Sequence, residues 1–134
     1  MSAYLRDTNH LGMAVDKASA VGQRIFEARL AGLRLGTCVP VLCEIEVGVK
    51  QVRQKAKYRR DLNHFLGQLR LWPIDLETVR IYGDIYTELR RRGRVLSQVD
   101  IMLAALARQR KLTILTTDRD FEALPDLRIE DWSK

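Results

Sequence analysis

Histidine, cysteine and aromatic residues are scarce in this sequence, and their scarcity restricts its chemistry. Cys38 and Cys43 form neither a CxxC pair nor a zinc-ligand spacing, so we expect two small buried side chains in a reducing compartment. His10 and His64 are too far apart in the chain to indicate a histidine mechanism. The GxSxG, P-loop and HExxH motifs are also missing, so nothing points to the enzyme classes that they mark.

Long apolar segments are missing too. The longest unbroken apolar run, residues 101–107, is far shorter than the roughly 20 residues of a membrane-spanning helix. The N-terminus has no basic stretch followed by an apolar one, as a secretory signal would. No internal repeat, low-complexity tract or linker divides the chain. We therefore expect a soluble, cytoplasmic protein without membrane contact, formed by a single domain over residues 1–134.

Acidic residues are the minority among the charged side chains. The chain has 23 Lys and Arg against 17 Asp and Glu, a formal net charge of +6 and a pI of about 9.7. This excess weakly favours a polyanionic partner. With 46% hydrophobic and 30% charged residues, the composition is that of a globular protein. Positive charge is densest in one stretch, which contains Lys50, Arg53, Lys55, Lys57, Arg59 and Arg60.

Strand and helix patterns alternate along the chain. Strands are predicted around residues 4–6, 37–41, 71–74, 112–115 and 128–130, and helices around 19–29, 42–50, 62–69, 76–92 and 99–110. Pro40 is expected to end the second strand. In the helix that Asp75 caps, the predicted buried stripe is Val79, Tyr82, Tyr86 and Leu89. The alternation predicts an α/β fold with three layers, α/β/α, around a mainly parallel sheet of four to five strands.

Four acidic residues are predicted to lie at one edge of this sheet. Asp7 and Asp118 follow strands, whereas Glu44 and Asp100 fall in predicted first turns of helices. In a right-handed β-α-β unit, the carboxyl end of a strand and the amino end of the next helix share an edge. Taken singly, each acid has an ordinary structural role, such as a turn, a helix cap or, at Ser97–Asp100, a capping box.

Taken together, the four acids indicate a divalent metal site. Asp100 opens the most apolar helix of the chain, and a buried carboxylate is costly unless it is paired or metal-bound. Clustered carboxylates raise one another's pKa, and an all-oxygen ligand set selects Mg²⁺ or Mn²⁺ over zinc. Asp120 lies beside these four residues. Such a site, surrounded by Lys and Arg, suits phosphodiester hydrolysis.

Short segments along nearly the whole chain resemble PIN-domain nucleases, specifically the VapC-like toxins of bacterial toxin–antitoxin pairs. They are YLRDTN at 4–9, VLCEIEVG at 41–48, LRRRG at 89–93, DIMLAA at 100–105, LTTDRDF at 115–121 and LRIEDW at 127–132. The resemblance implies an Mg²⁺-dependent endoribonuclease, usually a homodimer, silenced by a cognate antitoxin. The implied catalytic ligands are Asp7, Glu44, Asp100 and Asp118, with Asp120 as rival or helper and Thr117 as an assisting residue.

Further predictions concern the surroundings of these acids. Asn9 is a candidate to support the metal ligands, or else a turn-forming residue. The residues predicted to hold RNA backbone are Lys50, Arg53, Lys55 and Lys57; the alternative is an ordinary solvated helix face. The apolar residues around Leu62, Phe65 and Leu66 form either a self-complementary dimer face or part of the core.

Two competing functions remain at this point. A receiver-like signalling domain needs an acid pair after its first strand and a lysine after its last inner strand, but Asp7 has no acidic neighbour and Thr116-Thr117-Asp118 offers no lysine. A metal-free RNA-binding α/β domain would leave Asp100 unexplained. Ribonuclease chemistry therefore accounts for more of the sequence than either alternative.

Overall fold

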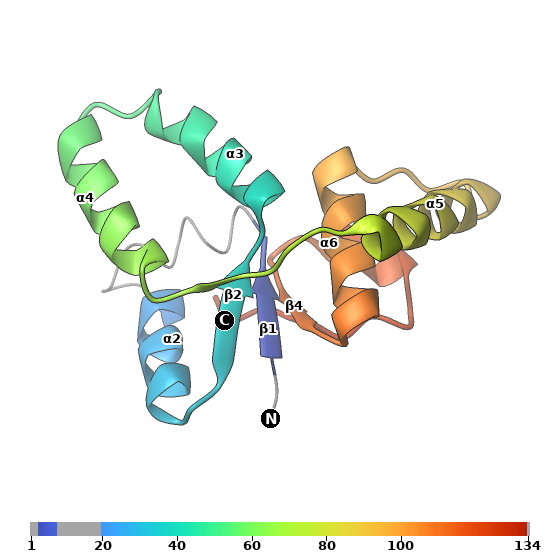
Figure 1. Cartoon of the computed structure of the whole chain (residues 1–134), viewed down its shortest axis with the longest axis horizontal. Coiled ribbons are helices and arrows are strands. Elements are labelled where there is room, and N and C mark those ends of the chain that lie inside the picture. Colours follow the sequence, from blue (N-terminus) through green and yellow to red (C-terminus); the bar gives the residue numbers. More distant parts are fainter. Residues whose placement is uncertain (1–2, 8–19, 134) are drawn as a thin grey trace.

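The computed structural model describes residues 3–7 and 20–133 and shows a parallel five-stranded sheet flanked by helices (Figure 1). The strands are β1 (Ala3–Arg6), β2 (Arg34–Thr37), β3 (Arg70–Leu71), β4 (Thr113–Leu115) and β5 (Ile129–Glu130). The helices are α2 (Ala20–Leu30), α3 (Val39–Val49), α4 (Lys55–Leu66), α5 (Leu76–Arg91), α6 (Gln98–Arg110) and the 3-10 helix η1 (Arg119–Ala123). The predicted three-layer α/β fold with a parallel sheet is confirmed.

The strand order β3-β2-β1-β4-β5 puts β1 in the middle of the sheet. In Figure 1, α2 and α4 lie on one side of the sheet, α5 and α6 lie on the other, and α3 lies beyond the upper ends of the strands. The chain winds outward in opposite directions from β1 and its neighbour β4. In open α/β sheets the carboxyl ends of the strands at such a point form the usual ligand crevice.

The second predicted strand, at residues 37–41, is wrong in position. β2 covers Arg34–Thr37 and shares only Thr37 with the prediction. α3 begins at Val39 with Pro40 in its first turn, so Pro40 starts a helix instead of ending a strand. Proline fits there because the first-turn N–H groups of a helix have no intrahelical partner. A consequence is that Glu44 lies in the second turn of α3 and not in the first.

Gly36 lets β2 and β3 pair closely. A Cβ atom at this position would stand 2.5 Å from the carbonyl oxygen of Arg70 and 2.6 Å from Nε1 of Trp72. Both distances are too short for any side chain. β3 is only Arg70–Leu71, shorter than the strand predicted at 71–74. The last hydrogen bond to β2 is the one that the Trp72 amide donates to the carbonyl oxygen of Thr37, and the chain leaves the sheet after it.

The predicted buried stripe of α5 is right at Leu89, which is buried, and at Tyr82, which packs partly buried against the core. It is wrong at Val79 and Tyr86, which are 58% and 44% exposed. Thr78 and Ile85 are buried in their place, so the buried face is rotated from the prediction. Thr78 explains the rotation, because its hydroxyl donates to the side chain of Gln109 on α6. The predicted Asp75 cap is confirmed, since its carboxylate accepts the amide of Thr78 at 3.0 Å.

The core decides one open alternative and corrects one side-chain prediction. Leu62 and Phe65 are buried, and Leu66 packs against the same cluster, so these residues belong to the core and offer no dimer face. Cys38 is buried as expected, but Cys43 is exposed on α3. Across residues 3–7 and 20–133, no helix has both the length and the apolar composition needed to cross a membrane.

Candidate active site

The carboxyl ends of β1 and β4 place Asp7 and Asp118 close together. The two strands pair in parallel with Arg6 opposite Leu115, so the residues that follow, Asp7 and Thr116, end the strands side by side. The Asp7 amide extends the ladder by donating to the carbonyl oxygen of Leu115 at 3.2 Å. Asp7 is only 5% exposed, so its carboxylate is largely removed from water.

A buried hydroxyl connects the two acids. The Thr116 hydroxyl donates to the Asp7 carboxylate, and the Asp118 amide donates to the same Thr116 oxygen at 2.9 Å. The Asp118 carboxylate in turn caps η1 by accepting the Asp120 amide at 2.8 Å. The turn after β4 therefore fixes the orientation of the Asp7 carboxylate through the Thr116 hydroxyl.

Sequence reasoning singled out Thr117 and missed Thr116. Thr117 is half-buried in the same turn, but the hydroxyl that bonds to Asp7 is that of Thr116, which is buried. The register of a parallel pair would have been the signal, because Thr116 follows β4 as Asp7 follows β1. Asn9, the other proposed supporting residue, lies outside the described residues.

Asp100 lies in the first turn of α6 and brings a third carboxylate to this edge. Ser97 caps the helix, its hydroxyl oxygen accepting the Asp100 amide at 3.1 Å. Burial raises the pKa of Asp100 to about 6, a rise that the Ser97 hydrogen bond opposes and nearby negative charges reinforce. These charges belong to Asp118, Asp7 and Glu44. The predicted acids therefore interact electrostatically at one edge of the sheet.

Glu44 and Asp120 are the more exposed members of the predicted set. Glu44 lies on α3, which contacts α6. Of the three neighbouring charges that raise the pKa of Asp100, that of Glu44 contributes least. Asp120 is exposed on η1 and contributes its backbone amide to Asp118. Of the two rivals, Asp118 is thus the one whose carboxylate charge acts on Asp100.

The carboxylate oxygens at this edge of the sheet are ligands that suit Mg²⁺, but the described side chains are not spaced as a complete metal site. Within the described ranges, no three His, Cys, Asp or Glu side chains are arranged to hold a metal ion together. Mg²⁺ prefers oxygen ligands, however, and commonly binds through one or two carboxylates while keeping several waters. A half-buried Asp100 among three other carboxylates is compatible with such a hydrated ion, which would relieve their repulsion.

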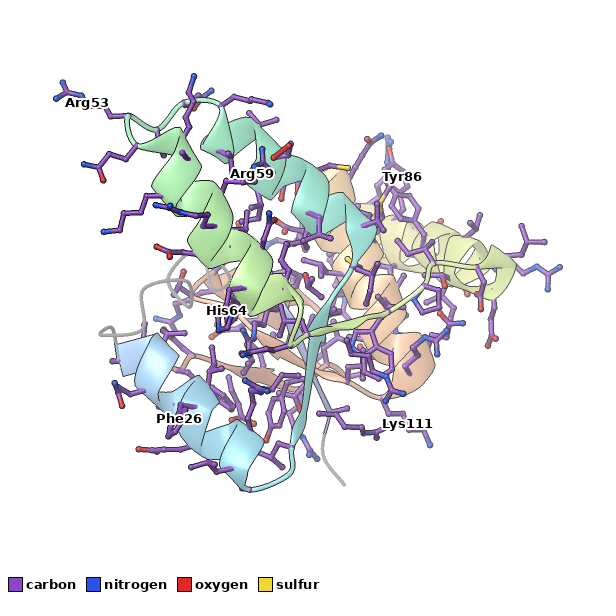
Figure 2. The ribbon with its side chains drawn as sticks, turned by 60° about the vertical axis from the view of Figure 1, so that its left-hand side comes forward. Phe26, Arg53, Arg59, His64, Tyr86 and Lys111 are labelled. Carbon is purple, nitrogen blue, oxygen red and sulfur yellow. The ribbon has the colours of Figure 1, made fainter. Side chains whose placement is uncertain are left out.

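The predicted RNA-binding residues lie in the turn between α3 and α4 and in the first turn of α4. Lys50, Arg53, Lys55 and Lys57 are all exposed there, and Figure 2 shows Arg53 at the outer tip of this turn. Arg59, from the same basic stretch, is used differently, because it pairs with Glu46 at 2.8 Å and joins α4 to α3. At about 1.5 Å per helical residue, Lys50 is roughly 9 Å along α3 from Glu44.

Known proteins resemble this chain along nearly its whole length. The chain belongs to the PIN-domain family, whose model matches residues 4–127. Within that family its relatives are VapC proteins. It is 32% identical over 134 residues to the "tRNA(fMet)-specific endonuclease VapC" of Shigella flexneri, covering 99% of this chain and 100% of that protein. It is 26% identical over 132 residues to "Ribonuclease VapC2" of Rickettsia felis, covering 98% of each.

Solved structures show the same fold. VapBC of Salmonella typhimurium, crystallised with DNA, matches with a TM-score of 0.85 and 26% identity, covering 98% of this chain and 99% of that one. VapBC2 of Rickettsia felis, also bound to DNA, matches with a TM-score of 0.87 and 24% identity, covering 97% and 98%. The resemblance to VapC-like PIN domains is confirmed, and the receiver-like alternative is not supported.

Proposed function

We propose that this chain is an Mg²⁺-dependent endoribonuclease that hydrolyses RNA phosphodiester bonds and is the toxin of a type II toxin–antitoxin pair. The observation that carries the proposal is the group of carboxylates at the sheet edge, where burial and the charges of Asp118, Asp7 and Glu44 raise the pKa of Asp100. The relatives named as ribonucleases and the neighbours solved as VapBC complexes support the same activity and an antitoxin partner.

In this proposal Asp7, Glu44, Asp100 and Asp118 hold the metal, with Asp120 nearby. Bound Mg²⁺ supplies Lewis-acid stabilisation of phosphoryl charge and an activated water. The protein supplies position. The Thr116 hydroxyl orients Asp7, the Ser97 cap fixes the first turn that carries Asp100, and the turn that Asp118 caps keeps its carboxylate beside them. Lys50, Arg53, Lys55 and Lys57 hold the RNA backbone without taking part in the chemistry.

A homodimer is part of the proposal. With Leu62 and Phe65 buried in the core, a self-complementary surface needs other residues. Exposed apolar side chains in the first turn of α5 offer one, namely Leu76 at 77% and Val79 at 58% exposure. Sedimentation at micromolar concentration measures the oligomeric state. A Val79→Lys variant should shift the equilibrium toward the monomer.

The experiment that tests the activity is RNA cleavage in Mg²⁺ and in EDTA. Wild type should cleave only with the metal, whereas Asp7→Asn and Asp100→Asn should be inactive although folded. Asp84→Asn removes the same charge from an exposed position on α5 and serves as the matched control. RNA that is bound equally tightly by all variants but never cut would favour a metal-free RNA-binding domain, and equal turnover in EDTA would remove the metal from the proposal.

A further inference from the structure

A hollow lies beside the candidate active site, between the C-terminal part of α5 and the segment that leads into α6. It has a volume of about 430 Å³. We call it the Tyr86 hollow, after the aromatic side chain in its wall; its other lining residues include Arg90, Arg94, Val95, Leu96 and Ile101. No residue predicted from the sequence to bind RNA lines it.

The Tyr86 hollow is attached to the acid-bearing end of α6. Leu96 and Ile101 line it, and these two buried residues flank the segment of Ser97 and Asp100. Figure 2 shows Tyr86 on the side of α5 that is near the amino end of α6. A ligand that fills this hollow therefore lies next to Asp100 and the metal site of the proposed function.

The wall of the hollow is already formed by backbone hydrogen bonds. α5 ends in a left-handed turn at Gly93, with φ of +65°, and the Arg94 amide donates to the carbonyl oxygen of Leu89 at 2.9 Å. This is the usual geometry by which a glycine closes a helix. Arg94 and Val95 are therefore held at the rim, where Val95 is 88% exposed.

The lining combines flat cationic and aromatic groups without any acid. The Arg90 guanidinium lies over the Tyr86 ring, 5.5 Å from its centroid, and donates to the Tyr86 hydroxyl oxygen at 2.8 Å. Asp and Glu are missing from the residues that line the hollow. In the part of the chain that the structure describes, neither Arg90 nor Arg94 forms an ion pair, whereas Arg92 next to them pairs with Glu88.

We propose that the Tyr86 hollow binds one nucleotide of single-stranded RNA next to the bond that is cut, an inference that rests on the proposed function. Unpaired bases stack on aromatic rings and on arginine planes, and the adjoining phosphate pairs with cations. Tyr86 with Arg90 supplies the stacking surface, Arg94 the phosphate contact, and Leu96 and Ile101 an apolar floor. An acidic peptide would satisfy the arginines but would make no use of the stacked planes.

The test measures RNA binding separately from cleavage. Variants are made in the Asp7→Asn protein, which is expected to bind RNA without cutting it, and are titrated with a labelled single-stranded RNA. Tyr86→Ala should weaken binding about tenfold, since losing one base–aromatic stack typically has an effect of this order. Tyr86→Phe keeps the ring and should bind within about twofold of its parent. Arg91→Ala, at an exposed neighbouring position outside the hollow, is the charge control for Arg94→Ala.

An abasic site moved along the RNA identifies the occupant. At one position it should weaken binding to the parent protein about as much as Tyr86→Ala does, and should add no further loss in the Tyr86→Ala protein. In the active enzyme, Tyr86→Ala should raise KM and leave kcat nearly unchanged. If no abasic position matters, or if Tyr86→Ala binds like its parent while losing affinity for an acidic peptide, the nucleotide assignment is wrong. RNA that binds in this way but is never cut would contradict only the proposed nuclease activity.

Discussion

The two ends of helix α6 place carboxylates in opposite electrostatic surroundings. At the N-terminal end, burial and the charges of neighbouring acids together raise the pKa of Asp100 to about 6. At the C-terminal end, Arg108 donates to both oxygens of Asp126 at 2.8 Å and lowers the pKa of that carboxyl. Arg108 also pairs with Glu88 at 3.3 Å.

The difference shows which end of the helix is built for stability. Ion pairs around Arg108 favour the folded state, if only slightly, because they are partly exposed. The carboxylates around Asp100 oppose folding while they are charged and without a cation, since each destabilises the others. Perturbed groups of this kind cluster at functional sites.

Catalytic activity should separate the two ends most strongly. Asp100→Asn is expected to lower RNA cleavage roughly a hundredfold or more, because it removes a proposed metal ligand while keeping the shape of the side chain. Asp126→Asn removes the same charge from the other end and should keep activity within about twofold. Cleavage rates at saturating Mg²⁺, with circular dichroism as a check on folding, measure both. Wild-type turnover by Asp100→Asn would contradict the assignment.

Metal binding should stabilise only those variants in which the carboxylates at the N-terminal end of α6 are intact. A ligand at a hundred times its Kd adds about 2.7 kcal/mol to folding, so millimolar Mg²⁺ should raise the Tm of wild type by about 5 °C or more. Asp126→Asn should show the same rise and Asp100→Asn a much smaller one. The measurement is a thermal melt of each protein in EDTA and in Mg²⁺. Absence of any Mg²⁺ shift in wild type would leave the carboxylates with a capping role alone.

The acid-bearing end of α6 was predictable from the sequence, because the elements around it carry strong local signals, whereas no prediction concerned Arg108 and Asp126. The apolar run after Asp100 marked α6, and polar turns marked the ends of β1 and β4. Parallel topology then brought the acids to one edge without any knowledge of tertiary contacts. The helix cap of Asp75 was predicted correctly for the same reason, since caps depend on residues only three positions apart.

The errors arose where a contact distant in sequence decided the outcome. Pro40 is compatible with the end of a strand and with the start of a helix. The pairing of β2 with β3 ends at Thr37, opposite Leu71, and Pro40 therefore falls in the first turn of α3. The rotation of α5 depends on the Thr78–Gln109 hydrogen bond, which joins residues on two helices. Thr116 was missed because its role requires the register between β1 and β4.

Arg6 is a further example of a contact that alternation alone did not reveal. The alternation of side chains along a strand predicted that Arg6 lies on the face of β1 opposite to Asp7. It did not predict that Arg6 is completely buried, with its guanidinium 4.9 Å from the centroid of the Phe65 ring. Burial, together with the charge of Arg29, lowers the pKa of Arg6 to about 9. No pattern in one sequence indicates such a costly placement on a central strand.

The pH dependence of stability should have opposite signs at the two ends. The folded pKa of Asp100, about 6, lies above its unfolded value of 3.8, so the folded protein binds the proton more tightly between these pH values. Its contribution to stability therefore falls as pH rises from about 4 to about 6 and stays unfavourable above that range. In EDTA, Asp100→Asn should be as stable as wild type near pH 4 and gain relative to it toward pH 7.

For Asp126 the sign is reversed. Arg108 lowers its folded pKa, so its contribution is present above the unfolded pKa and disappears as pH falls through the folded value. The deficit of Asp126→Asn against wild type should therefore shrink on acidification. Melts in EDTA from pH 3.5 to about 7.5 compare both variants with wild type. Parallel curves for the two variants would show that the ends of α6 do not differ as described.

The smallest effect concerns how Arg108 is shared between its two partners. Removing Asp126 leaves Arg108 paired with Glu88, so Asp126→Asn should cost only about 0.2–1 kcal/mol, as is usual for exposed pairs. Replacing Arg108 by Gln should cost more, because it leaves Glu88 and Asp126 without their common cation. The double variant should cost less than the sum of the two single changes, since the Arg108–Asp126 interaction is lost only once. Urea titrations at pH 7 in EDTA measure the four free energies of unfolding. Strict additivity would mean that the pair contributes nothing, and that the C-terminal end of α6 is neutral in stability instead of favourable.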